Sequence, residues 1–247
     1  MNERRLLAQR ILSLIDLTNL NDGCTPEDIK TLCARASGQW GHTAAVCVWP
    51  RFVELSKSLL THSPIQVATV VNFPSGDGEV AATIKETVDA LNAGADEIDL
   101  VLPYAALQRG DDSTVLAMLS EIRNVVPTPS LLKIILETGE LVDPILIERA
   151  AHLAIGAGAD FIKTSTGKTR TSATPQAVTI MLATIRASGR AVGLKPSGGI
   201  KTVDDALEYL QLADAVMGQG WATPQTFRFG ASGPTRRIGR SKALAKA

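Results

Sequence analysis

Short apolar runs rich in β-branched residues alternate with stretches of helical periodicity along nearly the whole chain, and no other feature restricts the fold as strongly. Strands are expected at Leu12–Thr18, Ala44–Trp49, Gln66–Asn72, Glu97–Leu102, Leu132–Glu137, Phe161–Thr164, Val192–Lys195 and Ala213–Met217. Helices are expected between them, at Pro26–Arg35, Arg51–Leu60, Glu79–Ala93, Ser113–Val125, Pro144–Ile155, Pro175–Ala187 and Val203–Leu210. Eight strands that alternate with helices in one mid-sized chain predict an α/β fold, a single closed (β/α)8 TIM barrel. A doubly wound sheet is the alternative, but it usually has fewer strands and needs crossovers to both of its faces.

The barrel is expected to take in residues 1–247 as one domain, with a short helical extension before the first strand and a flexible tail after about residue 234. Proline and glycine are spread along the sequence, so nothing marks a linker. An internal echo supports a repeating architecture, because Ala93-Gly-Ala-Asp-Glu-Ile-Asp99 and Ala157-Gly-Ala-Asp-Phe-Ile-Lys163 both run from a helix end through a Gly turn into a strand. The echo places Asp99 and Lys163 at the same position of their strands, near the barrel mouth where active sites form.

Composition suits a barrel interior and excludes several classes of partner. Hydrophobic residues make up 45% of the chain and aromatic residues only 4%, so Ala, Val, Ile and Leu must fill the core. Lys plus Arg equals Asp plus Glu at 25 each, which leaves no basic field for nucleic acid. No apolar stretch is long enough to cross a bilayer, and the N-terminus lacks the features of a signal peptide. We therefore expect no nucleic-acid partner, no membrane association and a cytoplasmic location.

The cysteines and histidines favour a reducing compartment and argue against a metal site. Cys24, Cys33 and Cys47 are odd in number and show no metal-binding spacing. Cys47 lies in an apolar run and is expected to be a buried small side chain. The three histidines are scattered and form no cluster with carboxylates. Neither a metal nor a cofactor is therefore expected.

Three lysines occupy runs that otherwise have the composition of buried strands. They are Lys133, Lys163 and Lys195, and Asp99 occupies a fourth run of the same kind. An ionised side chain in an apolar strand is costly unless it is paired or neutralised. Three cations cannot all pair with one acid, so at least one lysine should be shifted toward its neutral form. A neutral lysine in a closed site is a nucleophile for carbonyl carbons, which is how imine-forming enzymes begin.

Glycine-rich segments follow the last two expected strands. Ser197-Gly198-Gly199 comes directly after the run that bears Lys195, and Phe229-Gly-Ala-Ser-Gly233 comes after the last strand. Phosphate sites in (β/α)8 barrels commonly use these two loops, with backbone amides as donors. Glycine lets the backbone approach the anion closely. The two loops together predict a substrate that carries a phosphate, to which Lys168 could add a positive charge.

At this point the motifs resemble those of a known family, deoxyribose-phosphate aldolase. The resemblance rests on Asp160-Phe-Ile-Lys-Thr-Ser-Thr-Gly-Lys168, Leu194-Lys-Pro-Ser-Gly-Gly199, Gly94-Ala-Asp-Glu-Ile-Asp99, Ile15-Asp-Leu-Thr18, Val70-Val-Asn-Phe-Pro74, Lys133-Ile-Ile-Leu-Glu-Thr-Gly-Glu140 and Phe227-Arg-Phe-Gly-Ala-Ser232. These motifs run in order over essentially the whole chain, and the nine-residue lysine motif is highly specific. The family implies a barrel fold and a metal-independent class I aldolase. It reversibly splits 2-deoxy-D-ribose 5-phosphate into glyceraldehyde 3-phosphate and acetaldehyde.

The resemblance also implies roles for individual residues. Lys163 aligns with the imine-forming lysine, Lys195 with the second lysine and Asp99 with the carboxylate of the proton relay. The substrate-binding candidates are Gly198, Gly199, Ser232, Lys168 and Thr166. The expected partners are a small sugar phosphate and acetaldehyde, and the chain is expected to form a homo-oligomer, either a dimer or a tetramer.

The sequence departs from the family at its end, and other functions stay open from the residues alone. Some members end in a tyrosine, whereas the tyrosines here are Tyr104 and Tyr209, and Gly233 stands where some members have a second serine.

One alternative function is a sugar-phosphate isomerase with Asp99 as the base and the lysines as electrophilic stabilisers. The others are a pyridoxal-phosphate enzyme, which would be coloured, and a non-catalytic sensor that only binds an anion.

Overall fold

The computed structural model describes residues 3–232, and in it eight parallel strands close into a barrel. The strands are β1 (Ile15–Asn19), β4 (Ala45–Val48), β5 (Gln66–Val71), β6 (Glu97–Val101), β7 (Leu131–Ile135), β8 (Phe161–Lys163), β9 (Gly193–Lys195) and β10 (Phe229–Ala231). Each strand pairs with the next, and β10 returns to pair with β1. Bridges between Leu194 and Phe227 and between Ser197 and Gly230 close the ring. The prediction of a (β/α)8 barrel is therefore confirmed, and the doubly wound alternative is wrong.

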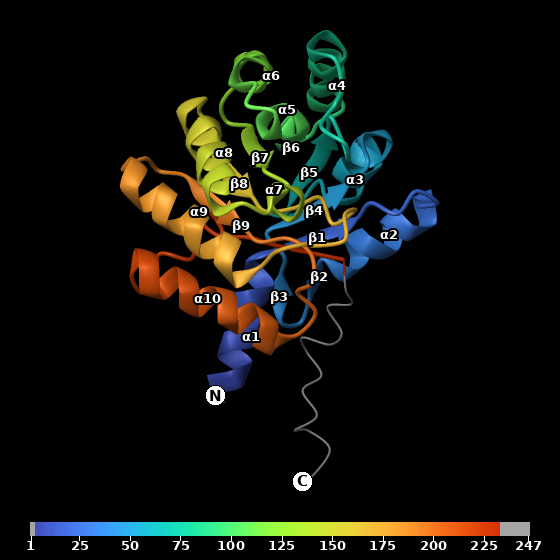
Figure 1. Cartoon of the computed structure of the whole chain (residues 1–247). Helices are drawn as coiled ribbons and strands as arrows, with labels where there is room; N and C mark the ends of the chain where they lie inside the picture. Colours follow the sequence, from blue (N-terminus) through green and yellow to red (C-terminus); the bar gives the residue numbers. More distant parts are fainter. Residues whose placement is uncertain (1–2, 233–247) are drawn as a thin grey trace.

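Helices surround the strands, as Figure 1 shows. They are α1 (Glu3–Ser13), α2 (Pro26–Arg35), α3 (Val53–Leu59), α4 (Val80–Asn92), α5 (Tyr104–Gln108), α6 (Asp112–Val125), α7 (Thr138–Leu141), α8 (Pro144–Gly156), α9 (Pro175–Ser188) and α10 (Val203–Met217). A short 3-10 turn, η1 (Pro50–Phe52), precedes α3, and a small hairpin of β2 (Ser37–Gly38) and β3 (Gly41–His42) precedes β4. Thr25 and Thr174 cap α2 and α9 with their hydroxyls, and a proline follows each of them in the first turn.

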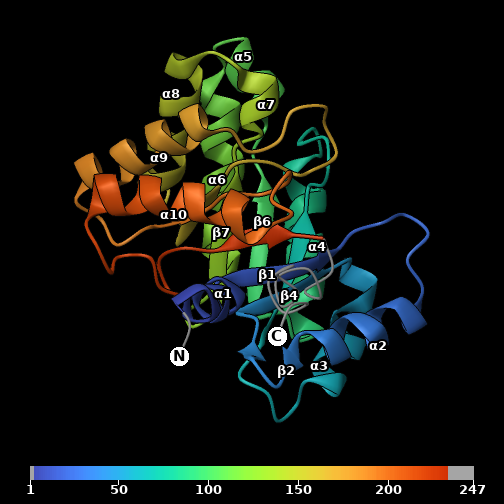
Figure 2. The same ribbon diagram turned by 90° about the horizontal axis from the view of Figure 1, so that it is seen from below.

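The expected N-terminal extension is the helix α1. It lies beside α10, as both views show (Figures 1 and 2), and Arg4 Nη2 lies 3.5 Å from Asp204 Oδ1 on that helix. Because Leu12 belongs to α1, the first strand begins at Ile15, three residues later than predicted. The tail expected after about residue 234 lies outside the described residues.

The eighth strand is not where the sequence placed it. Ala213–Met217 forms the last turns of α10, and the strand is Phe229–Ala231. Thr202 starts this helix with a capping box to Asp205, and its buried face continues through Leu210 and Ala213 without interruption. A short run of small apolar residues cannot be assigned to helix or strand from its composition alone, and here the periodicity of the preceding turns decides.

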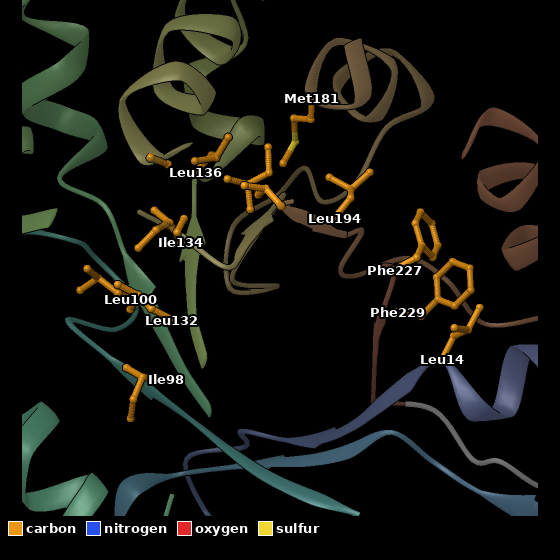
Figure 3. Close-up of a cluster of buried hydrophobic side chains, with 14 of the residues drawn as sticks. Leu14, Ile98, Leu100, Leu132, Ile134, Leu136, Met181, Leu194, Phe227 and Phe229 are labelled. Atoms are coloured by element: carbon orange, nitrogen blue, oxygen red, sulfur yellow. The ribbon is translucent and has the colours of Figure 1, made fainter. Parts of the chain in front are cut away.

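Strand alternation separates an apolar layer from a charged one. Figure 3 shows Ile98, Leu100, Leu132 and Ile134 along β6 and β7, with Met181 extending from α9 toward the strands. The residues between them in sequence, including Glu97, Asp99 and Lys133, form ion pairs with one another. Since successive side chains of a strand point to opposite faces, the apolar set packs under the helices and the charged set fills the barrel interior. In residues 3–232 no helix is both long and apolar enough to cross a bilayer.

Candidate active site

Asp99 lies at the centre of the three predicted lysines. Lys133 Nζ lies 2.8 Å from Asp99 Oδ1, and the Nζ atoms of Lys163 and Lys195 each lie 2.8 Å from Asp99 Oδ2. The register of the strands brings these side chains together. Asp99 is paired with Lys133 across β6 and β7, and Lys163 is paired with Lys195 across β8 and β9. Asp99 and Lys195 are fully buried, and the Lys163 side chain is 3% exposed. The structure thus brings together all three residues that the sequence singled out as catalytic, and Lys133 with them.

The sequence interpretation missed three further members of this cluster. Asp16 Oδ2 lies 2.5 Å from Lys195 Nζ, and Glu97 Oε2 lies 2.5 Å from Lys133 Nζ. Arg228 joins the two acids, with Nη1 2.7 Å from Asp16 Oδ1 and Nη2 3.1 Å from Glu97 Oε1. The premise of three cations against one acid is therefore wrong. The cluster holds three carboxylates and four cationic groups, so one positive charge remains in excess.

Lys163 is the group in this cluster whose positive charge is disfavoured. Burial lowers the pKa of Lys163, and the contact with Asp99, which opposes this, is partly offset by the nearby charge of Lys195. Burial also disfavours the charged form of Lys195, but Asp16 and Asp99 outweigh it and raise its pKa. In the same way Asp99 and Glu97 outweigh burial and raise the pKa of Lys133. Of the three lysines, Lys163 is the one whose pKa is lowered.

Asp99 keeps its negative charge in this setting. Burial alone would raise the pKa of its carboxyl group, but the three lysines around it lower that pKa well below its usual range. A lysine that titrates low, beside a carboxylate that stays ionised and an ammonium that stays protonated, provides a nucleophile, a proton acceptor and a proton donor within hydrogen-bond reach.

The loop after β8 carries two of the predicted substrate-binding residues, and both have protein partners. The Thr166 amide donates a 3.1 Å hydrogen bond to Glu137 Oε2, and the Thr166 hydroxyl donates to the same oxygen. Lys168 Nζ donates to Asp22 Oδ1 at 3.0 Å and lies 5.7 Å from the centroid of the Trp49 ring. Lys168 therefore connects the loops that follow β8 and β1.

The glycine-rich loops after β9 and β10 meet the β8 loop. Gly198 has φ 82°, and its amide donates to the carbonyl oxygen of Gly230 at 3.2 Å. A Cβ on Gly198 would clash with the Ser172 hydroxyl and would lie 3.8 Å from Gly167 Cα, so only glycine fits between these loops. Gly199, with φ 80°, has open space where a Cβ would be.

Unpaired amides gather at this junction. Within residues 3–232, the amides of Gly167, Gly199 and Ile200 have no hydrogen-bond acceptor. Ser232 follows β10 directly and is exposed. Free backbone N–H groups on neighbouring glycine turns form a concave site for an anion.

The three cysteines are free and buried, and burial raises the pKa of the Cys47 thiol. In the part of the chain that the structure describes, no group of three or more His, Cys, Asp and Glu side chains is arranged to hold a metal ion.

A closed barrel with a buried lysine centre at the carboxyl ends of its strands has the architecture of an enzyme. The DeoC/LacD family of aldolases matches residues 10–226, and the chain belongs to this family. It is a lyase of the aldolase class.

Individual relatives agree with this assignment. The chain is 55% identical over 230 residues to the deoxyribose-phosphate aldolase of Agrobacterium fabrum (strain C58), which covers 93% of this chain and 89% of the relative. A crystal structure of a candidate deoxyribose-phosphate aldolase from Toxoplasma gondii ME49 is 28% identical, with a TM-score of 0.86 over 96% of this chain and 93% of that one. The tetrameric deoxyribose phosphate aldolase of Aeropyrum pernix is 24% identical, with a TM-score of 0.76 over 99% of this chain and 94% of that one, and shows the fold alone.

Proposed function

We propose that this aldolase reversibly cleaves 2-deoxy-D-ribose 5-phosphate to D-glyceraldehyde 3-phosphate and acetaldehyde through an imine on Lys163. One observation carries the proposal: Lys163, alone among the three interior lysines, has a lowered pKa, and it lies 2.8 Å from an ionised carboxylate. The name of the Agrobacterium relative supports the choice of substrate.

Imine formation needs a neutral amine and a path for protons. Lys163 attacks the aldehyde carbon C1 of the open-chain sugar, and the carbinolamine loses water to give a protonated imine. Asp99 accepts the proton that leaves the amine, and Lys195, which stays protonated beside Asp16 and Asp99, donates a proton to the departing hydroxyl. The hydrogen bond between Lys195 Nζ and Asp99 Oδ2 provides a path by which the proton taken up by Asp99 replaces the one that Lys195 has donated.

Bond cleavage follows from the imine. Asp99, acting through water, accepts the proton of the C3 hydroxyl as the C2–C3 bond breaks, which releases glyceraldehyde 3-phosphate and leaves an enamine on Lys163. The same proton is then returned to C2 of the enamine. The cationic imine nitrogen accepts the electron pair of the breaking bond. Protonation of the enamine at C2 and hydrolysis of the resulting imine release acetaldehyde and restore the amine, so atoms and charge balance over the cycle.

The phosphate is held at the junction of the glycine loops. We assign the amides of Gly198 and Gly199 and the Ser232 hydroxyl to phosphate recognition, with Thr166 and Lys168 on the adjoining loop. The Gly198 amide contributes by exchanging its present bond to Gly230 for the anion. Lys168, now paired with the exposed Asp22, turns to the dianion when substrate binds.

We further propose that the protein is cytoplasmic and forms a homo-oligomer, either a dimer or a tetramer, in that reducing compartment. The three free cysteines suit that compartment. Light scattering coupled to gel filtration measures the assembly directly.

Product analysis tests the proposed reaction. Purified protein is incubated with 2-deoxyribose 5-phosphate, and acetaldehyde and glyceraldehyde 3-phosphate are assayed separately, with Lys163→Leu as the comparison. We expect both products in equal amounts from the wild type and neither from the variant. An isomerase would consume the sugar without releasing acetaldehyde, and a sensor would bind it unchanged, so either result contradicts the proposal.

A further inference from the structure

Glu137 is a buried carboxylate at the barrel mouth that belongs to neither the lysine centre nor the glycine loops. It lies two residues after the end of β7 and is fully buried. Its backbone has φ 54° and ψ 58°, in the left-handed region that residues other than glycine rarely adopt. Burial raises the pKa of its carboxyl group against the hydrogen bonds that Thr166 donates to it.

The Glu137 carboxylate holds the loop that follows the Lys163 strand at three points. One oxygen, Oε2, accepts from the amide and the hydroxyl of Thr166, and the other, Oε1, accepts from the Thr169 hydroxyl at 3.2 Å. The Thr166 hydroxyl in turn accepts from the Lys168 amide at 3.1 Å. A line of hydrogen bonds therefore runs from Glu137 through Thr166 to the backbone of Lys168 and fixes the turn that contains Gly167.

The backbone on both sides packs against the same loop. The Thr138 amide donates to the Thr164 carbonyl oxygen at 2.9 Å, and a Cβ on Gly139 would clash with the Thr171 carbonyl oxygen. On the other side, the Ala173 amide donates to the Ser197 carbonyl oxygen at 3.1 Å. The loop is thus enclosed between the turn after β7 and the turn after β9, and Glu137 supplies the side-chain contacts from the first of them.

We propose that Glu137 is a positioning residue for phosphate recognition. It does not contact the substrate. It holds residues 166–169 in the conformation in which the unpaired Gly167 amide lies beside Gly198, with Lys168 on the same turn, ready for the anion. The inference rests on the proposed function, since it assigns the phosphate of that substrate to this loop.

The expected effect is on binding and not on chemistry. If the loop without its anchor occupies the binding conformation only about a tenth of the time, the apparent affinity for the phosphate falls about tenfold. Glu137→Ala removes the three contacts. Glu140→Ala is the matched control, because Glu140 belongs to the same turn but is exposed, and its side chain makes no hydrogen bond.

Kinetics with two sugars separates positioning from general damage. For Glu137→Ala we expect KM for 2-deoxyribose 5-phosphate to rise about tenfold, with kcat changed less than about threefold, because only the competent fraction of the loop has changed. Activity on unphosphorylated 2-deoxyribose and the pH profile of kcat should stay as in the wild type, and Glu140→Ala should match the wild type throughout. Equal losses on both sugars, a shifted pH profile or an unchanged KM would overturn the proposal.

A second pair of variants makes the same test without removing the buried acid. Thr166→Val loses the hydroxyl that links Glu137 to Lys168, whereas Thr166→Ser keeps it. We expect valine to raise KM and serine to restore it; equal KM values for the two variants would contradict the proposal.

Binding of inorganic phosphate can be measured by phosphorus NMR, and this measurement does not depend on catalytic turnover. It should weaken in Glu137→Ala and not in Glu140→Ala. If the wild type does not cleave the sugar, the proposed reaction fails on its own, and this binding comparison still decides the role of Glu137.

Discussion

The lysine centre and the phosphate end of the candidate site are built from different parts of the barrel. The centre consists of side chains on strands, where parallel register places Asp99, Lys163 and Lys195 against one another in the buried interior. The proposed phosphate end consists of loops, where, among residues 3–232, the backbone amides of Gly167 and Gly199 have no acceptor. In the interior, the proposed reactivity depends on the charge balance among these side chains. At the rim, recognition depends on the conformation of three loops held against each other.

Among variants that keep Lys163, the largest effect on turnover should come from removing the charge of Asp99. Asp99→Asn preserves the shape of the side chain but removes the carboxylate that the three lysines share. Proton transfer through a positioned group contributes about 10²–10⁴-fold to rate, so kcat should fall by that order. Solvent deuterium exchange into acetaldehyde should fall with it. Near-normal turnover and exchange in the variant would mean that Asp99 only pairs charges.

A substitution at the proposed phosphate end should reduce activity on the phosphorylated sugar only. Gly199→Glu places a carboxylate where the dianion is expected. A Cβ at this position has no atom within 4 Å, although the φ of 80° strains any residue other than glycine. Lost hydrogen bonds to a charged group, at about 1.5–3 kcal/mol each, should lower kcat/KM for 2-deoxyribose 5-phosphate by roughly 10²–10³-fold. Kinetics on unphosphorylated 2-deoxyribose should hardly change. Equal proportional losses on both sugars would remove the distinction between the two regions.

The charge balance predicts a pH effect at Lys195. Its positive charge lowers the pKa of Lys163, so Lys195→Leu should raise that pKa and move the acidic limb of the pH–rate profile to higher pH. The loss of its proton-donor role should slow the reaction about 10²-fold, at the lower end of what a positioned acid contributes. Lys133→Leu is the comparison and should move the limb less, because Lys133 pairs with Glu97 and the other oxygen of Asp99. An acidic limb that stays in place would leave proton transfer or positioning as the role of Lys195.

Arg228 should matter more for stability than for turnover. It does not contact Lys163, and its guanidinium pairs with the buried Asp16 and Glu97. Breaking such a buried pair costs about 3–5 kcal/mol, because a charge is left without its partner. Arg228→Met should therefore lower the free energy of unfolding by that amount in denaturant titration, while Arg109→Met, at an exposed position, should not. A turnover loss as large as that of Asp99→Asn in the folded variant would place Arg228 in the chemistry.

The interior could be predicted from the sequence because charges in apolar strands stand out. Lys133, Lys163, Lys195 and Asp99 were found in this way, and they meet in the barrel. Glu97 could have been found as well, since it lies two residues before Asp99 and therefore on the same face of β6. Arg228 escapes the sequence prediction because that prediction places the last strand at Ala213–Met217. The alternation of inward and outward side chains was therefore not applied to the segment around Arg228.

The loop end could be predicted only in part. Glycine pairs after the last strands indicated an anion site, but no local pattern shows that Glu137 adopts a left-handed backbone or that Lys168 pairs with Asp22, which is 146 residues away in sequence. Contacts of this kind depend on how separate βα loops come together, and only the closed barrel specifies that.

The central claim is that the lowered pKa of Lys163 makes it the nucleophile, and reductive trapping tests it most directly. The protein is treated with acetaldehyde and borohydride, digested, and its lysine peptides are mapped by mass spectrometry. We predict one ethyl group, on Lys163, with loss of activity in step with labelling and no label on this peptide in Lys163→Leu. An adduct on Lys195 or Lys133 in its place, or no adduct in an active enzyme, would contradict the account.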